Sequence, residues 1–397
     1  MHEAQAETTA RAQVPVALFA LASGVIITNN FAPQVLVGAI ASSFGLQEAS
    51  GGLIAMMTLL GYATGLFYLV PLADLVETRR LVFSMLGGAT LAAAGVVFVP
   101  TVGPLVVLLF VLGAACSAIQ VLMPAAAAMA EPRRRGRVLG DIMSGLMVGI
   151  LLSRPVASLL AGTWGWRAFY VSSAAAMASL AIALAFRLPE RVPVRTDGYP
   201  RLIASLWGLF EDEPVLRRRS ISAAIVMAAF NFYWTTIAYV LERAPLELGQ
   251  RGIAVFALVG AGGAIVTPLV GRLADRGLGT RVTRIAHVTL MAGFVLAALS
   301  ALAIPGPNAL ILGGLGMSAL MLDVGVLGDQ TVGRHLINQL RPEARGRVNA
   351  IFVGVFFLGG AIGSALSGML WAAGGWGAVC LGGVCLGSLA LALSTRR

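Results

Sequence analysis

Residues 104–129 read PLVVLLFVLGAACSAIQVLMPAAAAM and contain no charged side chain. An apolar stretch of about 18 or more residues is long enough to cross the hydrocarbon core of a bilayer as a helix. Eleven further stretches of this kind occur along the chain. The predicted spans are 14–38, 51–72, 80–99, 104–129, 138–162, 167–187, 220–241, 252–273, 283–303, 308–332, 347–372 and 375–394.

The composition of the whole chain is that of a polytopic membrane protein. Of its 397 residues, 58% are hydrophobic and a further 48 are glycine, while only 12% are charged. A soluble chain of this length cannot bury so much apolar surface, because single cores stop growing at about 250–300 residues. Composition therefore excludes a soluble enzyme, a disordered chain and a secreted disulfide scaffold. The three cysteines lie in apolar stretches and match no metal-ligand spacing.

The basic residues indicate the orientation in the membrane. All 28 residues counted as Lys or Arg are arginines, and 24 of them lie in the two tails and in the connections from even-numbered to odd-numbered spans. Only Arg167, Arg243 and Arg251 lie on the other side, and Arg154 lies inside the fifth span. Because arginine-rich loops stay in the cytoplasm, we expect a multi-pass protein of the bacterial inner membrane with both termini cytoplasmic. Short runs between spans set topology, so we expect no nucleic-acid partner.

The longest connection divides the chain into two parts. We predict an N-terminal six-helix bundle over 1–187, a cytoplasmic linker over 188–219 and a C-terminal six-helix bundle over 220–397. The middle of the linker, 202–210, is apolar and contains Trp207. It predicts an amphipathic helix on the membrane surface, and a solvated linker is the alternative.

Short motifs recur in the two halves at nearly constant distances. The pairs are LAD at 72–74 and 273–275, NF at 30–31 and 231–232, Pro132 and Pro342, RGRV at 135–138 and 345–348, and GW at 165–166 and 375–376. The first two pairs are 201 residues apart and the others 210. These offsets indicate a duplicated six-helix unit whose copies run parallel, as in transporters that bind substrate between their halves near the midplane.

Two loops and the start of the sixth span resemble segments of a known family. The segments are GRLADRG at 271–277, PLADLVETRR at 71–80, and WGWR at 164–167 at the start of the sixth span. They resemble motifs of the major facilitator superfamily. The resemblance covers nearly the whole chain and implies an all-α fold of twelve transmembrane helices in two pseudo-symmetric six-helix bundles.

The same resemblance implies a gating role for the charges of these loops. A carboxylate at a helix end can bind a neighbouring helix N-terminus or an arginine in one gate conformation and release it in the other. The implied gating residues are Asp74, Arg79, Arg80, Asp275 and Arg276.

A narrower resemblance concerns LDVG at 322–325, LRPEARGRVN at 340–349 and QVLMP at 120–124. These segments are similar to a bacterial branch of drug and sugar efflux permeases. The resemblance implies a secondary active transporter, not an enzyme, that exports a small organic molecule by alternating access in exchange for protons. The alternatives are a proton symporter or uniporter for a small polar solute such as a sugar or organic acid and, from another class, a non-transporting membrane receptor. We expect a monomer without cofactor or metal, whose partners are the substrate, protons and the lipid bilayer.

Three charged residues inside the predicted spans are candidates for the transport site. Arg154 precedes Pro155, at a place where antiporters of the superfamily carry a glycine. A buried arginine costs about 2.5 kcal/mol or more in a membrane, so Arg154 is expected to contact substrate, or else to bind carbonyls or reach the outer interface. Asp323 and Asp329 in the tenth span are the candidate proton-coupling residues. The alternatives are a permanent ion pair of Asp323 with Arg334, and a solvated or gating Asp329 near the cytoplasmic end.

Buried amides and aromatic rings complete the predicted site. Amides facing lipid would leave donors and acceptors unsatisfied, so they are expected to face a cavity or another helix. If they only join helices, their loss would lower stability without changing substrate affinity. The predicted substrate-binding residues are Asn30, Gln34, Gln120, Arg154, Asn231, Tyr233, Trp234 and Gln330. We interpret His287 and His335 as polar helix-end residues rather than proton carriers.

Overall fold

The computed structural model describes residues 14–188, 190, 198–260, 262, 267–303, 307–341 and 344–395. All regular structure within these ranges is helical, which confirms the predicted all-α class. Helices suit the composition, because they satisfy every backbone hydrogen bond internally in an apolar surrounding. The two tails, Pro342 and part of the 188–219 connection lie outside the described residues.

Seven helices and one short turn form the N-terminal half. They are α1 (Val16–Ser43), α2 (Glu48–Tyr68), η2 (Val70–Asp74), α3 (Thr78–Phe98), α4 (Val102–Cys116), α5 (Ile119–Met129), α6 (Arg135–Trp164) and α7 (Arg167–Ala185). The C-terminal half follows α8 (Tyr199–Asp212). It contains α9 (Pro214–Glu242), α10 (Gln250–Ala257), α11 (Thr267–Leu273), η4 (Ala274–Leu278), α12 (Gly279–Ala298), η5 (Leu299–Ala303), α13 (Asn308–Ile337) and α14 (Arg345–Thr395).

Ten helical stretches of the described chain are long and apolar enough to cross a membrane. One of them, Arg345–Thr395, contains the last two predicted spans, which are separated by a break at Gly374 and Gly375. Gly375 has φ 58°, a conformation that glycine adopts without strain. The predicted span 252–273 corresponds to two helices, α10 and α11. Residues 261 and 263–266, which lie between them in the sequence, are outside the described ranges.

Glycines bring helices of each half into backbone contact. A Cβ at Gly149 of α6 would collide with the backbone of Gly24 in α1, and a Cβ at Gly359 of α14 with the backbone of Ala224 in α9. These two contacts are related by shifts of 210 and 200 residues, close to the offsets seen in the sequence. Small residues at such crossings permit close packing where lipid offers no hydrophobic driving force. The duplication is therefore present in the packing as well as in the motifs.

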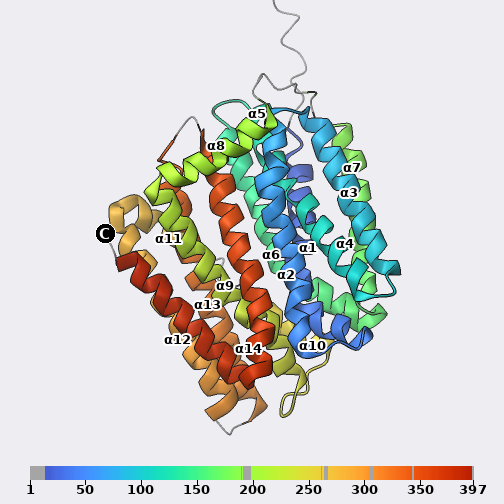
Figure 1. Ribbon diagram of the computed structural model, residues 1–397, viewed down its shortest axis with the longest axis vertical. Helices are drawn as coiled ribbons and strands as arrows, with labels where there is room; N and C mark the ends of the chain where they lie inside the picture. The colour runs from blue at the N-terminus through green and yellow to red at the C-terminus, as the bar shows by residue number, and fades with distance from the viewer. Residues whose placement is uncertain are drawn as a thin grey trace, which may run out of the picture.

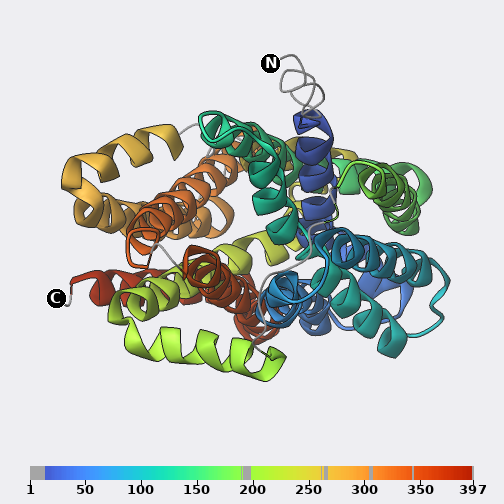
Figure 2. The same cartoon turned by 90° about the horizontal axis from the view of Figure 1, so that it is seen from above.

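The two halves lie side by side, with α2 against α14 and α6 against α10 across the interface (Figures 1 and 2). Helix α8 contacts α2 and η2 of the first half and α9 and α14 of the second. The predicted amphipathic helix in the connection is thus present, and it packs Leu202 and Leu206 inward while Trp207 is exposed. The predicted linker boundary at 219 differs from the structure, because α9 begins at Pro214 and carries arginines 217–219.

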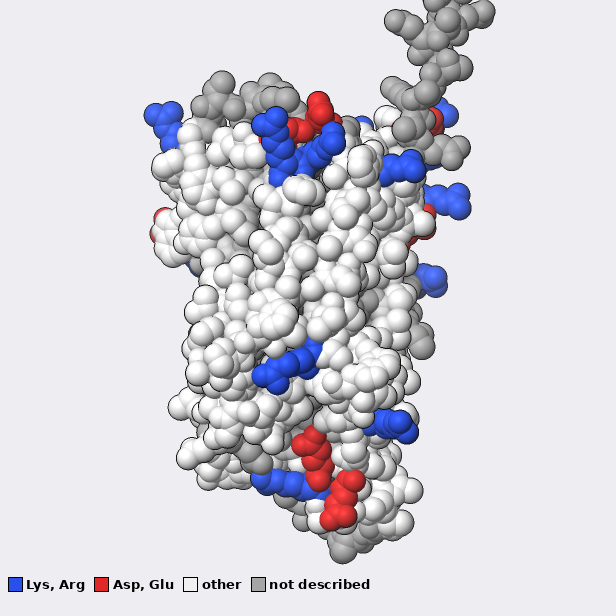
Figure 3. All heavy atoms as spheres, turned by 90° about the vertical axis from the view of Figure 1, so that its right-hand side faces the viewer, with Lys and Arg blue, Asp and Glu red and all other residues white. Residues whose placement is uncertain are grey.

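Charged residues mark two ends of the molecule. We call the upper end in Figure 1 the arginine-rich end; it is formed by η2, α8 and the first turns of α6, α9 and α14. On the face shown in Figure 3, arginines and carboxylates gather toward the upper and lower ends, and the surface between them is mostly uncharged. This pattern fits a body that crosses a bilayer with its two ends in water.

Candidate functional site

A cavity of about 90 Å³, here called the central cavity, lies between the two halves. Its walls come from α1, α2, α5 and α6 of the first half and from α9, α10, α13 and α14 of the second. The wall includes Gln120, Arg154, Asp323 and Gln330, four residues predicted from the sequence. The structure therefore brings two of the three charged candidates, Arg154 and Asp323, to one place.

Part of the Arg154 guanidinium is bound by other protein groups, and part of it remains free to bind a ligand. It is 5% exposed, its Nε donates a hydrogen bond of 3.0 Å to Gln34 Oε1, and its guanidinium carbon lies 4.0 Å from the centre of the Trp234 ring. The rings of Phe31 and Phe230 lie 5.4 and 5.5 Å away. These contacts stabilise a buried cation. Its Nη2 has no hydrogen-bond partner among the described residues, so one donor remains for a ligand.

Asp323 faces Arg154 without forming an ion pair with it. The two charges interact electrostatically, but they are not among the described pairs within 4.0 Å, and Asp323 Oδ2 is buried without a partner. A Cβ at Gly260 would lie 2.9 Å from Asp323 Oδ2 and 2.7 Å from Trp234 Cζ2, so the carboxylate lies beside the ring on which Arg154 rests. Arg334 also lines the cavity, and its Nε is likewise unpartnered, so the alternative of an Asp323–Arg334 ion pair is not seen.

A chain of buried amides lies behind Arg154. Gln34 Nε2 donates to Asn231 Oδ1 over 2.7 Å, which joins α1 to α9. Ser364 of α14 also donates to Asn231 Oδ1, and Asn231 Nδ2 donates to the Met227 carbonyl. The chain positions the guanidinium and links the halves, while Gln34 and Asn231 themselves are outside the cavity wall.

Three other predicted binding residues lie near the cavity but not in its wall. Trp234 contacts Arg154 through its ring face. Tyr233 is buried and its hydroxyl donates to the Leu315 carbonyl over 2.7 Å. Asn30 is 1% exposed, and neither of its amide atoms has a hydrogen-bond partner among the described residues.

A second cavity of about 660 Å³, here called the vestibule, lies between the halves at the arginine-rich end. Gln120 lies in the walls of both cavities. Between them, Asn349 donates to Gln120 Oε1 over 3.5 Å and Gln120 Nε2 donates to the Tyr62 hydroxyl over 3.3 Å. The Tyr62 ring packs on Phe357 with 4.5 Å between ring centres. Amides and rings from both halves thus separate the vestibule from the central cavity.

At the opposite end the halves are in contact. Gly162 of α6 lies against Gln250 of α10, and Gly38 of α1 lies against Glu242 of α9. The structure is therefore open toward the arginine-rich end and closed at the other.

The predicted gating residues occupy different surroundings. Asp74 lines the vestibule together with Arg135, Arg345 and Arg347. The others lie at the arginine-rich end, outside the walls of both cavities. Arg79 pairs with Glu190 at 3.1 Å, Arg80 with Glu77 at 2.7 Å, Asp275 lies 3.3 Å from His335, and Arg276 is exposed.

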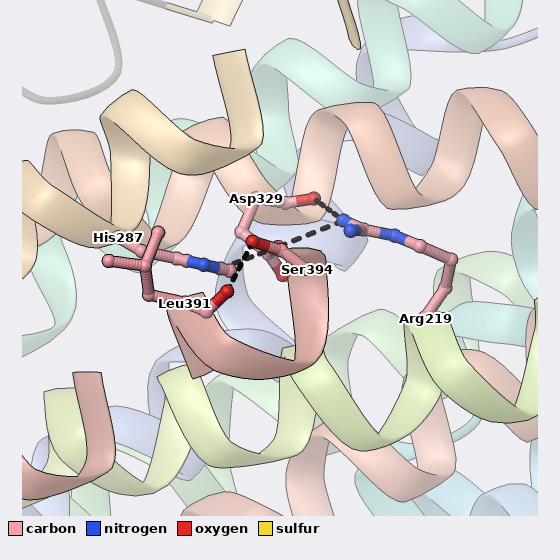
Figure 4. A network of polar contacts seen from close by, with 5 residues as sticks. All are labelled: Arg219, His287, Asp329, Leu391 and Ser394. Atoms are coloured by element: carbon pink, nitrogen blue, oxygen red, sulfur yellow. Dashed lines mark hydrogen bonds and ion pairs between the residues drawn. The ribbon is translucent and has the colours of Figure 1, made fainter. Parts of the chain in front are cut away.

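Asp329 lies in the interior of the second half, away from the central cavity. Its side chain is 1% exposed; Oδ1 accepts from Arg219 Nη2 at 2.8 Å and lies 3.1 Å from His287 Nε2 (Figure 4). The expectation of a solvated Asp329 is thus wrong, because α9 and α12 supply a cation and an imidazole. His287, interpreted from the sequence as a polar helix-end residue, is fully buried within α12 (Gly279–Ala298).

Several cavity residues were not predicted from the sequence. They are Tyr62, Arg334, Phe356 and Phe357, together with apolar side chains such as Met147 and Met227. Tyr62 offered a weak signal as a phenol inside an apolar span. Arg334 fell outside the predicted end of its span at 332, whereas α13 continues to Ile337.

The model of the Major Facilitator Superfamily matches residues 18–332. The chain belongs to this superfamily. It is 36% identical over 366 residues to the uncharacterized transporter YgaY of Escherichia coli O157:H7, covering 91% of this chain and 90% of that one. It is 32% identical to the chloramphenicol resistance protein of Streptomyces lividans, over 66% of this chain and 67% of that one. The structure of the nucleoside transporter NupG matches with a TM-score of 0.73 at 14% identity, covering 94% of this chain and 99% of that one.

The match to the Major Facilitator Superfamily confirms both the family and the fold that the loop motifs implied. The chain is a multi-pass membrane transporter, in agreement with the names of its relatives. The likeness to NupG shows the fold alone.

Proposed function

We propose that this chain exports a small organic molecule in exchange for protons, with the central cavity as the binding site. The observation that carries the proposal is the unpaired Asp323 carboxylate facing Arg154 across an aromatic-walled cavity between two repeated halves. A buried carboxylate without a fixed partner can take up and release a proton. The chloramphenicol resistance relative supports export of an antibiotic-like molecule.

The cavity chemistry suits an amphipathic substrate. Rings of Phe31, Phe230 and Phe357 offer apolar faces, while Gln120 and Gln330 offer donors and acceptors. The volume of about 90 Å³ is below the ~300–1,000 Å³ of typical ligand sites, so substrate entry requires the rings between the vestibule and the cavity to move. Tyr62 and Phe357 belong to different halves, and separation of the halves at the arginine-rich end provides this movement.

Proton and substrate exchange because both compete for the Asp323 carboxylate in the central cavity. When Asp323 is ionised, its unpartnered Oδ2 can accept a hydrogen bond from a polar group of the substrate, while Arg154 Nη2 donates to another. When a proton occupies Asp323, this charged acceptor is lost and the substrate is released. Proton and substrate therefore occupy the site alternately, which is the requirement for antiport.

Alternating access requires the vestibule to close when the other end opens. Asp74 of the first half lies in the same cavity wall as Arg345 and Arg347 of the second. We propose that the halves rock until Asp74 approaches the arginine-bearing first turn of α14. A carboxylate beside arginines and a helix N-terminus is stabilised, so this contact would hold the vestibule shut.

The direction of the driving gradient tests the proposal. Purified protein in liposomes with an acidic interior is expected to accumulate substrate from a chemically diverse panel, because protons leave as substrate enters. Liposomes with an acidic exterior are the matched comparison. Accumulation only with an acidic exterior would show symport, and equal equilibration under both gradients would show uniport; either result rejects the antiport proposal.

The proposed orientation places the arginine-rich end in the cytoplasm. In a variant with the three native cysteines replaced, a cysteine at exposed Thr101 is expected to react with a membrane-impermeant reagent in intact cells. A cysteine at exposed Thr395 is expected to react only after the cells are opened. The reverse pattern would invert the topology.

A further inference from the structure

A separate cavity of about 180 Å³ lies in the second half at the arginine-rich end, between α9, α12, α13 and the end of α14. We call it the lateral cavity. It shares no lining residue with the central cavity or the vestibule. Its volume is several times the ~30 Å³ share of one water molecule, so it has room for a small polyatomic group.

The polar groups that line the lateral cavity are mainly hydrogen-bond donors. Arg218 and Arg219 come from the first turns of α9, and Gly279 and Thr280 are the first two residues of α12. The start of α12 brings the positive end of its dipole to the cavity. None of the described lining residues is acidic. Asp329 compensates the charge of Arg219 from behind the wall, whereas Arg218 forms no ion pair among the described residues.

Two buried hydroxyls in this wall have no partner. Ser222 is 3% exposed and Thr283 is 2% exposed, and neither hydroxyl oxygen makes a hydrogen bond among the described residues. Leaving a buried hydroxyl unsatisfied costs about 1–3 kcal/mol, and buried polar groups are in general bonded. Arg219 Nε is buried and unpartnered as well. A bound acceptor would satisfy these groups.

Asp329 holds Arg219 in position for such an acceptor. Arg219 Nη2 donates to both the carbonyl and the Oδ1 of Asp329, at 3.0 and 2.8 Å, as Figure 4 shows. His287 contacts the same carboxylate from α12. Arg219 is thus fixed in the interior through Nη2, while its Nε has no partner among the described residues.

We propose that the lateral cavity binds a phosphate-bearing anion, held by Arg218, Arg219 and the hydroxyls of Ser222 and Thr283. Phosphate matches a fixed guanidinium and nearby hydroxyls, because its oxygens accept several hydrogen bonds at once. The wall also contains the apolar side chains of Val215, Leu336 and Leu393, of which Val215 and Leu336 are exposed at the surface. The same chemistry is available from an anionic phospholipid headgroup or from free phosphate, and basic pockets between membrane helices bind such headgroups.

The proposal is tested by binding, without a transport readout. Delipidated full-length protein is titrated with phosphatidylglycerol, with phosphatidylcholine and with inorganic phosphate, while thermal unfolding and native mass spectrometry report binding. Phosphatidylglycerol is expected to raise the melting temperature and phosphatidylcholine is not. Arg218→Gln and Thr283→Val are each expected to weaken binding about tenfold, the effect of losing one charge-assisted hydrogen bond.

The controls separate this site from general attraction to positive charge. Arg284→Gln removes an exposed charge of α12 outside the cavity wall and is expected to leave the affinity unchanged. Thr283→Val replaces an unsatisfied hydroxyl by a methyl of the same shape, so the ligand-free melting temperature is expected to be maintained. A response to phosphatidylglycerol alone assigns a lipid headgroup, and a response to inorganic phosphate alone assigns the free anion. Equal binding by the native protein, Arg218→Gln and Thr283→Val would overturn the proposal.

Discussion

Replacement of Asp323 by Asn is expected to abolish accumulation of substrate driven by a pH gradient, while exchange of labelled for unlabelled substrate continues. Asn is close in shape to a protonated carboxyl but cannot release a proton. If one proton exchanges for one neutral substrate, a gradient of one pH unit supports at most about tenfold accumulation. The Asp323→Asn variant is expected to reach a ratio of about one. Both quantities are measured in the same proteoliposomes, with and without the gradient.

Asp329→Asn is the matched control for this experiment. It makes the same change on the same helix, but at a carboxylate that is outside the central cavity and bound by Arg219 and His287. Breaking a buried ion pair is destabilising, so a lower melting temperature is expected with coupling retained. Coupled transport by Asp323→Asn would refute the proton role of Asp323. Loss of coupling in Asp329→Asn alone would transfer that role to the buried network of the second half.

The fold was largely predictable from the sequence, because hydropathy and repeated motifs are properties of whole segments rather than of single residues. Apolar stretches located the spans, and the repeated LAD and RGRV motifs indicated two related halves. Helix ends were less predictable, since a helix continues beyond the apolar segment wherever its backbone bonds remain satisfied. The arginines at the start of α9 are an example: they looked like linker and are the first turns of a spanning helix.

The candidate site was predictable only where a residue stood out from its surroundings. A lone arginine or aspartate in an apolar span is conspicuous, and Arg154 and Asp323 do share the central cavity. Phe357 is one phenylalanine among many apolar residues, and nothing local distinguishes a cavity ring from a packing ring. The pairing of His287 with Asp329 joins residues 42 positions apart, so it depends on how α12 packs on α13.

Replacement of Arg154 by Gln is expected to remove most of the substrate affinity, and Lys is expected to rescue it only in part. The guanidinium carbon lies 4.0 Å from the centre of the Trp234 ring while Nε donates to Gln34 Oε1. These contacts position Nη2, which has no partner among the described residues, and a hydrogen bond from a charged donor is worth about 1.5–3 kcal/mol, where each 1.4 kcal/mol is about tenfold in affinity. Lys retains the charge but not the planar, forked geometry, so its affinity is expected to lie between those of the native protein and Arg154→Gln.

The measurement for Arg154 is the dissociation constant of a substrate identified by counterflow, determined for variants that remain monodisperse and keep a cooperative thermal transition. Arg334→Gln is the matched control, because it removes an arginine that lines the same cavity, whereas the cation that contacts the Trp234 ring is Arg154. If Arg154 positions substrate through the ring and the amide chain, Arg154→Gln weakens binding more than Arg334→Gln does. Equal effects would show that only the total positive charge of the cavity matters. Unchanged affinity in Arg154→Gln would make the buried guanidinium a structural link between α6 and the Gln34–Asn231 pair.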